Sequence, residues 1–340
     1  MALTDPAPEV TGPRRKADHL RIAAGGGVSH TGATGLETVR LRHRALPERD
    51  LHDVSLRTTL LGVELGAPLV VSAMTGGTPE AASINARLAT AAAEHRIALT
   101  LGSGRALLDA PELLPTYRTS ARPPLLLANL GAGEVRRADG PERAERLVEL
   151  VGADGLSIHL NAIQEAVQPE GESCFAGVAE RIAATVERLA PVPVVVKEVG
   201  FGMDGRDVTL LQAAGVAAVD VAGAGGTNWA LVEGRRAPDA GALATAFSGW
   251  GVPTADALRE ARAAAPGLEL VASGGVRDGV EVAKCLALGA SAAGLARPLL
   301  VAAQAGHAAE ALSVLVEQLR IAAWACGVGN VGLLGQEHLR

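Results

Sequence analysis

The chain has 340 residues, 48% of them hydrophobic, and a formal net charge of −6 at pH 7. A chain of this length and composition can bury a large core, whereas its acidic balance argues against a nucleic-acid partner or an anionic membrane surface. The start of the sequence is polar and Pro-rich, unlike a signal peptide, and we find no apolar stretch long enough to span a bilayer.

The first 67 residues precede the regular part of the sequence. We expect residues 1–13 to form a flexible tail and residues 14–67 to form an extension that covers one end of the following domain. The extension begins with a basic cluster, RRKADH, which supplies Arg14, Arg15, Lys16 and His19. A Gly-rich loop follows at residues 25–37; it lacks the GK[ST] of a P-loop and has the character of a lid.

From residue 68 onward, eight short apolar or β-branched runs alternate with segments of helical period. The runs lie at residues 68–74, 97–103, 125–131, 156–161, 192–200, 216–226, 268–275 and 291–297. Such alternation indicates a parallel sheet covered by helices, and eight units favour closure into a barrel. We therefore predict an α/β fold, a single (β/α)₈ TIM barrel over residues 68–340 that ends in a C-terminal helix. An open doubly wound sheet is the alternative, but no GxGxxG turn follows an early strand.

Polar residues and glycines follow the eight runs at equivalent positions. These segments are AMTGG (73–77), GSGR (102–105), ANLG (128–131), HLNAIQE (159–165), KEVGFG (197–202), AGAGGTNW (222–229), SGGVRDG (273–279) and ARP (296–298). Because active sites of these barrels lie at the C-terminal ends of the strands, we expect the eight segments to meet at one mouth.

The last strand ends predict a phosphate site. Loops after strands seven and eight are the usual phosphate location in these barrels, and paired glycines let backbone N–H groups approach an anion. Gly274 and Gly275 form such a pair, and Thr227 adds a hydroxyl on the preceding strand. The glycine pair alone would indicate no more than a tight turn; its combination with the GGT segment favours phosphate.

Lys197 ends a fully apolar run, PVPVVVK, in a chain whose 31 basic residues are almost all arginines. A buried ammonium needs an anion, and a reduced flavin carries negative charge near its N1 atom. An ion pair with Glu198 or another carboxylate, or a Schiff-base lysine as in barrel aldolases, are the alternatives. With a flavin present, Met74–Thr75, Ser103 and Asn129 would face its ring system.

The segment HLNAIQE concentrates four polar side chains at the fourth strand end. Alternation along a strand places His159 and Asn161 on the same face. Gln164 does not titrate, so it would position or polarise a substrate. Glu165 has the chemistry of a Mg²⁺ ligand, since this ion combines one or two carboxylates with substrate phosphates, and also that of a helix-starting carboxylate.

In this order, RKADH, AMTGG, GSGR, ANLG, HLNAIQE, KEVGFG, AGAGGTNW and SGGVR resemble the motifs of the type 2 isopentenyl-diphosphate isomerases, which are FMN-dependent barrel enzymes. The resemblance covers nearly the whole chain, and only the stretch after Trp324 matches loosely. It implies FMN contacts from Ala73, Met74, Thr75, Ser103, Asn129, Lys197, Thr227, Gly274, Gly275, Ala296 and Arg297. It implies substrate contacts from Arg15, Lys16, His19, Ser103, Arg105, Asn161 and Gln164, catalytic roles for Gln164, His159 and Lys197, and a Mg²⁺ ligand in Glu165.

The activity that this resemblance implies is an allylic proton shift between isopentenyl diphosphate and dimethylallyl diphosphate in isoprenoid biosynthesis. The cofactors implied are FMN in its reduced form, NAD(P)H as its reductant, and Mg²⁺ for the diphosphate. An anionic flavin that acts as acid or base would explain why no pair of catalytic carboxylates stands out. The resemblance also implies a homo-oligomer, a tetramer or an octamer, in the cytoplasm.

Three other functions compete with this one. A flavin oxidoreductase of the 2-hydroxy-acid type would share the barrel and Lys197, but it needs a His base beside an Arg, and DVAGAGGTNW contains no His. An inosinate-type dehydrogenase would need a catalytic cysteine loop. The cysteines Cys174, Cys285 and Cys326 lie in helical or near-helical contexts without a CxxC, and we expect reduced, buried thiols. A non-enzymatic binding barrel would have little use for the polar residues converging on one mouth.

Overall fold

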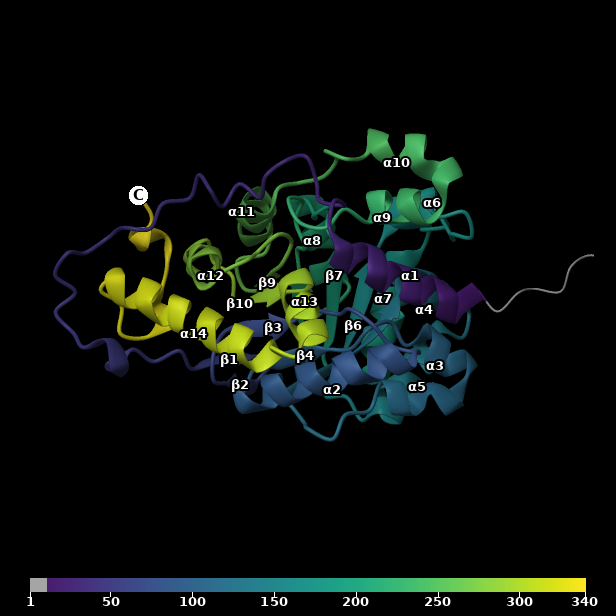
Figure 1. Ribbon diagram of the computed structural model, residues 1–340, viewed down its shortest axis with the longest axis horizontal. Helices are drawn as coiled ribbons and strands as arrows, with labels where there is room; N and C mark the ends of the chain where they lie inside the picture. The colour runs from purple at the N-terminus through teal and green to yellow at the C-terminus, as the bar shows by residue number, and fades with distance from the viewer. Residues whose placement is uncertain (1–10) are drawn as a thin grey trace, which may run out of the picture.

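The computed structural model describes residues 11–340, with side chains from Arg15 onward (Figure 1). Most of the expected tail, residues 1–13, lies outside the described residues. Helix α1 (Thr11–Gly25) begins inside that segment and carries the basic cluster.

Eight parallel strands close into a barrel in which the last strand, β10, pairs with the first, β3. The strands are β3 (Leu69–Val71), β4 (Ala98–Thr100), β5 (Leu125–Gly131), β6 (Gly155–Leu160), β7 (Val194–Glu198), β8 (Ala218–Asp220), β9 (Glu269–Ala272) and β10 (Ala292–Leu295). Seven lie inside the predicted runs, and β6 begins one residue early. The prediction of a single (β/α)₈ barrel is confirmed, and the open sheet is excluded.

Helices surround the barrel (Figure 1). In chain order they are α2 (Pro79–Glu94), α3 (Arg105–Asp109), α4 (Ala132–Arg136), α5 (Gly140–Val151), α6 (Ala162–Val167), α7 (Val178–Leu189), α8 (Gly205–Ala213), α9 (Trp229–Arg236), α10 (Gly241–Ala246), α11 (Thr254–Ala264), α12 (Gly279–Ala287), α13 (Arg297–Ala305) and α14 (Ala308–Ala325). Side chains cap several first turns; Thr78 Oγ1, for example, accepts from the N–H of Ala81 at 3.1 Å. Such caps satisfy N–H groups that have no partner within the helix.

The N-terminal extension covers the C-terminal mouth of the barrel first. Helix α1 packs against α9 and α13. The Gly-rich loop after it is fixed to the loop that follows β8, since the N–H of His30 donates to Gly226 O at 2.9 Å and that of Asn228 donates to Val28 O at 2.7 Å. The predicted covering role of the extension is therefore found at this end.

The extension then reaches the opposite end of the barrel, which the sequence did not predict. Strands β1 (Thr58–Leu60) and β2 (Val63–Leu65) form an antiparallel hairpin. Leu60 and Leu65 are buried in one cluster with Val70 and other residues of the barrel interior. The N–H of Leu61 donates to Glu269 Oε2, at the start of β9, at 2.7 Å. The strands of this hairpin are too short to give a clear period of two in the sequence.

Between the mouth and the hairpin at the opposite end of the barrel, the extension runs beside the C-terminal segment of the chain (Figure 1). Leu41 forms a bridge with Leu339, and Ser55 forms one with Asn330. The indole N–H of Trp324 donates to Arg49 O at 2.7 Å. The stretch after Trp324, to which the sequence assigned no role, thus fixes the path of the extension.

The cysteines correct one prediction. Cys285 and Cys326 are buried, as expected, but Cys174 is exposed in the loop before α7, so the prediction of a buried thiol was wrong there. The spacing of cysteines in the sequence argues against a disulfide framework, but it does not predict whether the loop that carries Cys174 is buried. Separately, among the described residues, no helix combines the length and the apolar character needed to cross a membrane.

The hairpin provides a test of the fold. Leu60 is 1% exposed and Leu46, on the same extension, is 72% exposed. We expect Leu60→Ala to lower the free energy of unfolding by about 2–5 kcal/mol through lost burial and a cavity, and Leu46→Ala by less than about 0.5 kcal/mol. Urea denaturation followed by circular dichroism measures both, and equal effects would argue against a hairpin that closes the barrel.

Candidate active site at the mouth of the barrel

The register of three neighbouring strands brings polar side chains into one row. His159 on β6 pairs with Lys197 on β7, and Lys197 pairs with Asp220 on β8. On the other side of β6, His159 Nδ1 lies 2.9 Å from Asn129 Oδ1 of β5. Four strands thus contribute adjacent polar groups at their C-terminal ends, and the sequence predicted those of β5, β6 and β7.

His159 is held in its neutral form. Burial is the main cause, followed by the positive charges of Lys197 and Lys16, and together they lower the pKa of His159 to about 4. In neutral imidazole one nitrogen donates and the other accepts. Because Asn129 Oδ1 can only accept, Nδ1 carries the proton and Nε2, which lies close to Gly131, keeps a lone pair.

Lys197 is buried, with 9% of its surface exposed. Its Nζ donates to Glu198 O at 2.5 Å and lies 4.0 Å from Asp220 Oδ2. The Glu198 carboxylate is not its partner: Oε2 accepts from the backbone N–H groups of the following loop, Val199 to Gly202, at 2.5–3.2 Å. The ion pair with Glu198 considered above is therefore not formed. The alternative partner, another carboxylate, is present as Asp220, at the limit of ion-pair distance.

Asp220 was missed by the sequence reasoning. It is buried at the end of β8, and its Oδ1 accepts from Ser273 Oγ at 2.6 Å and from the N–H of Ala222 at 3.2 Å. Burial raises the pKa of Asp220. An acidic residue inside the apolar run VAAVDVA was the available signal, since its register partner is a lysine.

Glycines let two loops of the predicted phosphate site touch through their backbones. Gly274 and Gly275 have φ values of +98° and +74°. A Cβ on Gly274 would lie 2.0 Å from Gly223 O, and one on Gly226 would lie 2.5 Å from Gly275 N. Neither position has room for a side chain, so the loops after β8 and β9 present backbone to the mouth.

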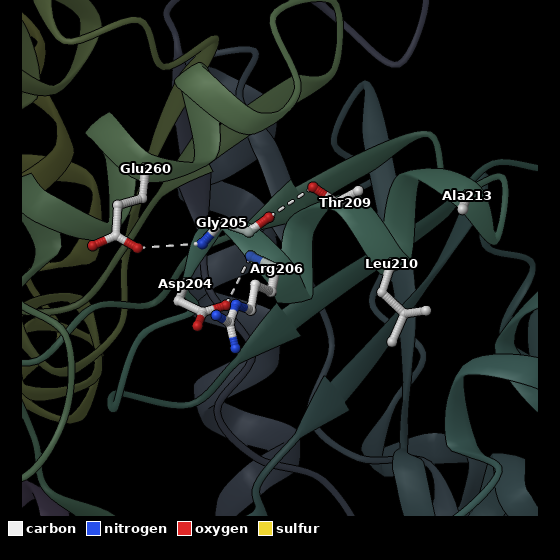
Figure 2. Close-up of a pocket in the computed structure, with 7 residues that line it drawn as sticks. All are labelled: Asp204, Gly205, Arg206, Thr209, Leu210, Ala213 and Glu260. Atoms are coloured by element: carbon white, nitrogen blue, oxygen red, sulfur yellow. Dashed lines mark hydrogen bonds between the residues drawn. The ribbon is translucent and has the colours of Figure 1, made fainter.

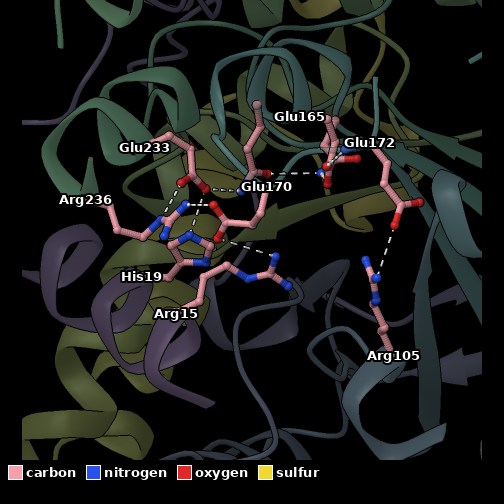
Figure 3. Close-up of polar contacts among 10 residues, drawn as sticks. Arg15, His19, Arg105, Glu165, Glu170, Glu172, Glu233 and Arg236 are labelled. Atoms are coloured by element: carbon pink, nitrogen blue, oxygen red, sulfur yellow. Dashed lines mark hydrogen bonds and ion pairs between the residues drawn. The ribbon is translucent and has the colours of Figure 1, made fainter. Parts of the chain in front are cut away.

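A buried carboxylate, Glu233, joins several polar side chains on one side of the mouth (Figure 3). Its Oε1 accepts from His19 Nε2 at 2.8 Å and from Gln164 Nε2 at 2.9 Å, and its Oε2 accepts from Arg236 Nε at 2.7 Å. Burial alone would raise the pKa of Glu233, but these hydrogen bonds lower it to about 2. Gln164 Oε1 lies 3.3 Å from Asn161 Nδ2, so both ends of the Gln164 amide are held.

The remaining basic residues also meet carboxylates (Figure 3). Glu170 lies 2.7 Å from Arg236 and 4.0 Å from Arg15. Gln168, with its amide oriented to satisfy both neighbours, donates to Glu233 Oε1 at 3.0 Å and accepts from Arg15 at 3.1 Å. The side chain of Arg105 lies 3.1 Å from Glu134 and 3.2 Å from Glu172.

Glu165 lies at this mouth with both oxygens in use. Oε1 accepts from Asn161 Nδ2 at 2.9 Å, and Oε2 accepts from the N–H of Glu172 at 2.8 Å. Over residues 15–340, one group of three potential metal ligands comes together, Asp50, His52 and Asp53, exposed on the extension and not at the mouth. A metal ion at Glu165 would therefore need most of its ligands from water and from a bound anion.

Two predicted flavin residues have contacts to the extension. Arg297 donates to Ala23 O at 2.9 Å and to Ala24 O at 3.3 Å, so its side chain fixes the end of α1. Thr227 forms a backbone bridge with Ser29. Thr75 Oγ1 is buried and has no hydrogen-bond partner among the described residues. An unpaired buried hydroxyl beside the mouth is a donor available to a ligand.

An open groove lies elsewhere, on the outer wall between α8 and α11 (Figure 2). It is lined by Asp204, Gly205, Arg206, Thr209, Leu210, Ala213 and Glu260, and holds none of the predicted residues. A narrow hollow inside the barrel is instead lined by Lys197, Asp220 and Thr100, among others. We assign the site to the mouth above this hollow, because buried charged groups converge there.

Comparison with known proteins shows the family to which the chain is similar. Residues 160–340 match the FMN-dependent dehydrogenase family. An isopentenyl-diphosphate delta-isomerase of Xanthobacter autotrophicus is 49% identical, with 94% of this chain and 95% of that protein covered. The isopentenyl-diphosphate delta-isomerase of a Synechococcus species is 46% identical over 95% of both chains.

Solved structures of flavoproteins share the fold at low identity. A flavocytochrome b2 variant superposes with a TM-score of 0.69 at 17% identity, covering 95% of this chain and 82% of that one. A mandelate oxidase variant with an FMN adduct gives 0.64 at 22% identity, covering 95% and 91%. The identity and coverage of the curated relatives are decisive, and the chain belongs to the isopentenyl-diphosphate delta-isomerase family, within the FMN-dependent dehydrogenases.

Proposed function

We propose that this chain interconverts isopentenyl diphosphate and dimethylallyl diphosphate by an allylic proton shift, with reduced FMN and Mg²⁺. The observation that carries the proposal is the Gln164 amide, held at the mouth by Glu233 and Asn161 beside a neutral His159. The mouth thus places uncharged polar groups, Gln164 and His159, together with the buried charges of Lys197 and Asp220, and it has basic groups at its rim. This arrangement suits a substrate with a hydrocarbon part and a diphosphate part.

The residues of the mouth fit FMN. Gly274 and Gly275, with the N-terminus of α13 at Ala296 and Arg297, would hold its phosphate, because glycine loops and helix N-termini offer N–H groups to anions. The further contacts that we propose come from Ala73, Met74, Thr75, Ser103, Asn129, Lys197 and Thr227. When bound in its reduced form, FMN would supply an electron-rich ring that exchanges a proton and stabilises positive charge.

Lys197 is suited to stand next to that ring. Lys197 is 9% exposed, and Asp220 Oδ2 lies 4.0 Å from its Nζ. A buried cation with only a distant counter-ion favours an anion placed against it. We propose that Lys197 stabilises negative charge on the cofactor.

Gln164 and His159 would act on the hydrocarbon part of the substrate. The Gln164 amide is fixed at both ends, so it positions the reacting carbons at little entropic cost. The free Nε2 of His159 accepts a hydrogen bond or a proton. Neither residue places a full negative charge beside the reacting carbons.

The diphosphate would bind at the rim, through Arg15, Lys16, His19, Arg105 and a Mg²⁺ ion on Glu165. Binding energy from this remote part of the substrate holds the reacting carbons in place. NAD(P)H as reductant, a tetramer or octamer, and a cytoplasmic location complete the proposal; the family resemblance supports them.

A turnover experiment tests this function. FMN-loaded protein, reduced with dithionite under anaerobic conditions and supplied with Mg²⁺ and isopentenyl diphosphate, should form dimethylallyl diphosphate. We expect Gln164→Ala to lower kcat roughly 10²-fold, the scale on which a misplaced reactant loses rate. Glu165→Ala should raise the Mg²⁺ concentration for half-maximal rate roughly 10–100-fold. Product can be followed by mass spectrometry.

The oxidised protein is the internal control, because it should form no product. Turnover of a 2-hydroxy acid by the FMN-loaded protein, with none of isopentenyl diphosphate, would contradict the proposal. It would favour the oxidoreductase alternative.

A second prediction concerns cofactor binding. Gly274→Ala would place a Cβ 2.0 Å from Gly223 O at a φ of +98°, so we expect loss of most bound FMN. Gly267→Ala is the matched control, since a Cβ there meets nothing within 4 Å. The ratio of flavin to protein absorbance after reconstitution measures both. Full FMN content in Gly274→Ala protein would place the phosphate elsewhere.

A further inference from the structure

Lys16 reaches the mouth from α1 and ends above the turn that follows β3. Its Nζ donates to Tyr117 Oη at 2.7 Å and to Ser103 O at 3.1 Å. A Cβ on Gly77 would lie 3.2 Å from Nζ, so the ammonium rests against the backbone of this turn. A long, flexible side chain is therefore held at one point.

Tyr117, the one tyrosine of the sequence, follows the 3₁₀ helix η2 (Pro111–Thr116) and is 1% exposed. Its ring fills the space that Gly76 leaves free, since a Cβ on Gly76 would lie 2.2 Å from its Cε1. Its hydroxyl donates to Ser103 O at 2.8 Å and offers its lone pairs to Lys16. The Tyr117 hydroxyl is therefore fixed in position where it accepts the hydrogen bond of Lys16.

Lys16 differs from the other basic side chains of the rim. His19, Arg105 and Arg15 each meet a carboxylate, through Glu233, through Glu134 and Glu172, and through Glu170. Both acceptors of Lys16 are uncharged oxygens. Within the part of the chain whose side chains are described, no carboxylate lies within ion-pair distance of Lys16, so its charge is not neutralised.

We propose that Tyr117 is a positioning residue for anion binding: its hydroxyl holds Lys16 in place without neutralising it, so that the ammonium binds a phosphoryl oxygen of the substrate. An ammonium has three N–H donors. Two of them go to Ser103 and Tyr117, which leaves one for the anion. The inference rests on the proposed function only for the identity of the organic group that carries the diphosphate.

The protonation of Lys16 gives the inference a pH signature. Burial, followed by the nearby charge of Arg15, lowers the pKa of Lys16 to about 8. The ammonium is present below this pH, and its attraction for an anion is lost as the pH rises through it. The groups around Lys16 keep their state near pH 8: the pKa of His159 is about 4, burial raises that of Tyr117, and Arg15 is a guanidinium.

Binding of inorganic diphosphate to the FMN-loaded protein with Mg²⁺ tests the inference. Tyr117→Phe keeps the ring and removes the hydroxyl. We expect its affinity in titration calorimetry at pH 7 to fall roughly tenfold, the scale for a hydrogen bond to a charged group. The pH midpoint at which binding weakens should also move below that of the wild type, because the ammonium loses an acceptor. Ionisation of the diphosphate is the same for both proteins and cancels.

Thr116→Val is the matched control. It removes the neighbouring hydroxyl, which accepts from the N–H of Gly77 at 2.8 Å, and should lower thermal stability without moving the pH midpoint. In a Lys16→Gln background, Tyr117→Phe should cause no further loss of affinity, since the coupled partner is gone.

Equal affinity and equal pH midpoints in wild type and Tyr117→Phe would overturn the inference. If the wild type binds inorganic diphosphate in a Tyr117-dependent way but does not convert isopentenyl diphosphate, the proposed function is wrong and the inference is supported. A failure of the inference and a failure of the proposed function therefore give different results.

Discussion

A fully buried carboxylate can persist only where enough donors replace its lost water, and Glu233 meets this condition through residues from separate parts of the chain. His19 comes from α1, Gln164 from α6 and Arg236 from α9 itself. Loss of any one donor would leave the buried charge of Glu233 poorly satisfied. The relative positions of α1, α6 and α9 are therefore fixed by their contacts with this carboxylate. The position of the N-terminal helix over the mouth and the orientation of the Gln164 amide therefore depend on the same carboxylate.

A second constraint is the close approach of backbones around the predicted phosphate site. Gly223, Gly226, Gly274 and Gly275 have no room for a Cβ, because the facing loops and the residues Thr34 and Thr254 fill the space. At these four positions, the loops after β8 and β9 present polar backbone rather than side chains. Cations enter the mouth from other elements, Lys197 from β7 and Lys16 from α1. Under the proposed function, anion recognition is divided between rigid backbone and a few positioned side chains.

The sequence predicted the barrel and its mouth because both follow from local patterns and topology. Apolar runs mark strands, and parallel strands bring their C-terminal ends together, so residues such as His159 and Lys197 were expected to be neighbours. Partners far apart in the sequence had no such pattern. Glu233 lies 214 residues from His19, and Tyr117 lies 101 residues from Lys16. The hairpin below the barrel was too short to be periodic, and exposure of Cys174 depends on what covers one loop.

The path of the extension has a consequence for synthesis on the ribosome. Helix α1 is made before the barrel, but Arg297, which holds its end, follows the last barrel strand, and Asn330, which pairs with Ser55, follows α14. A nascent chain can therefore form barrel units in turn, while α1 has no permanent place until the last barrel strand has been made. The mouth is completed after the barrel, and an unfinished chain would expose apolar side chains of α1, including Leu20 and Ile22, to chaperones.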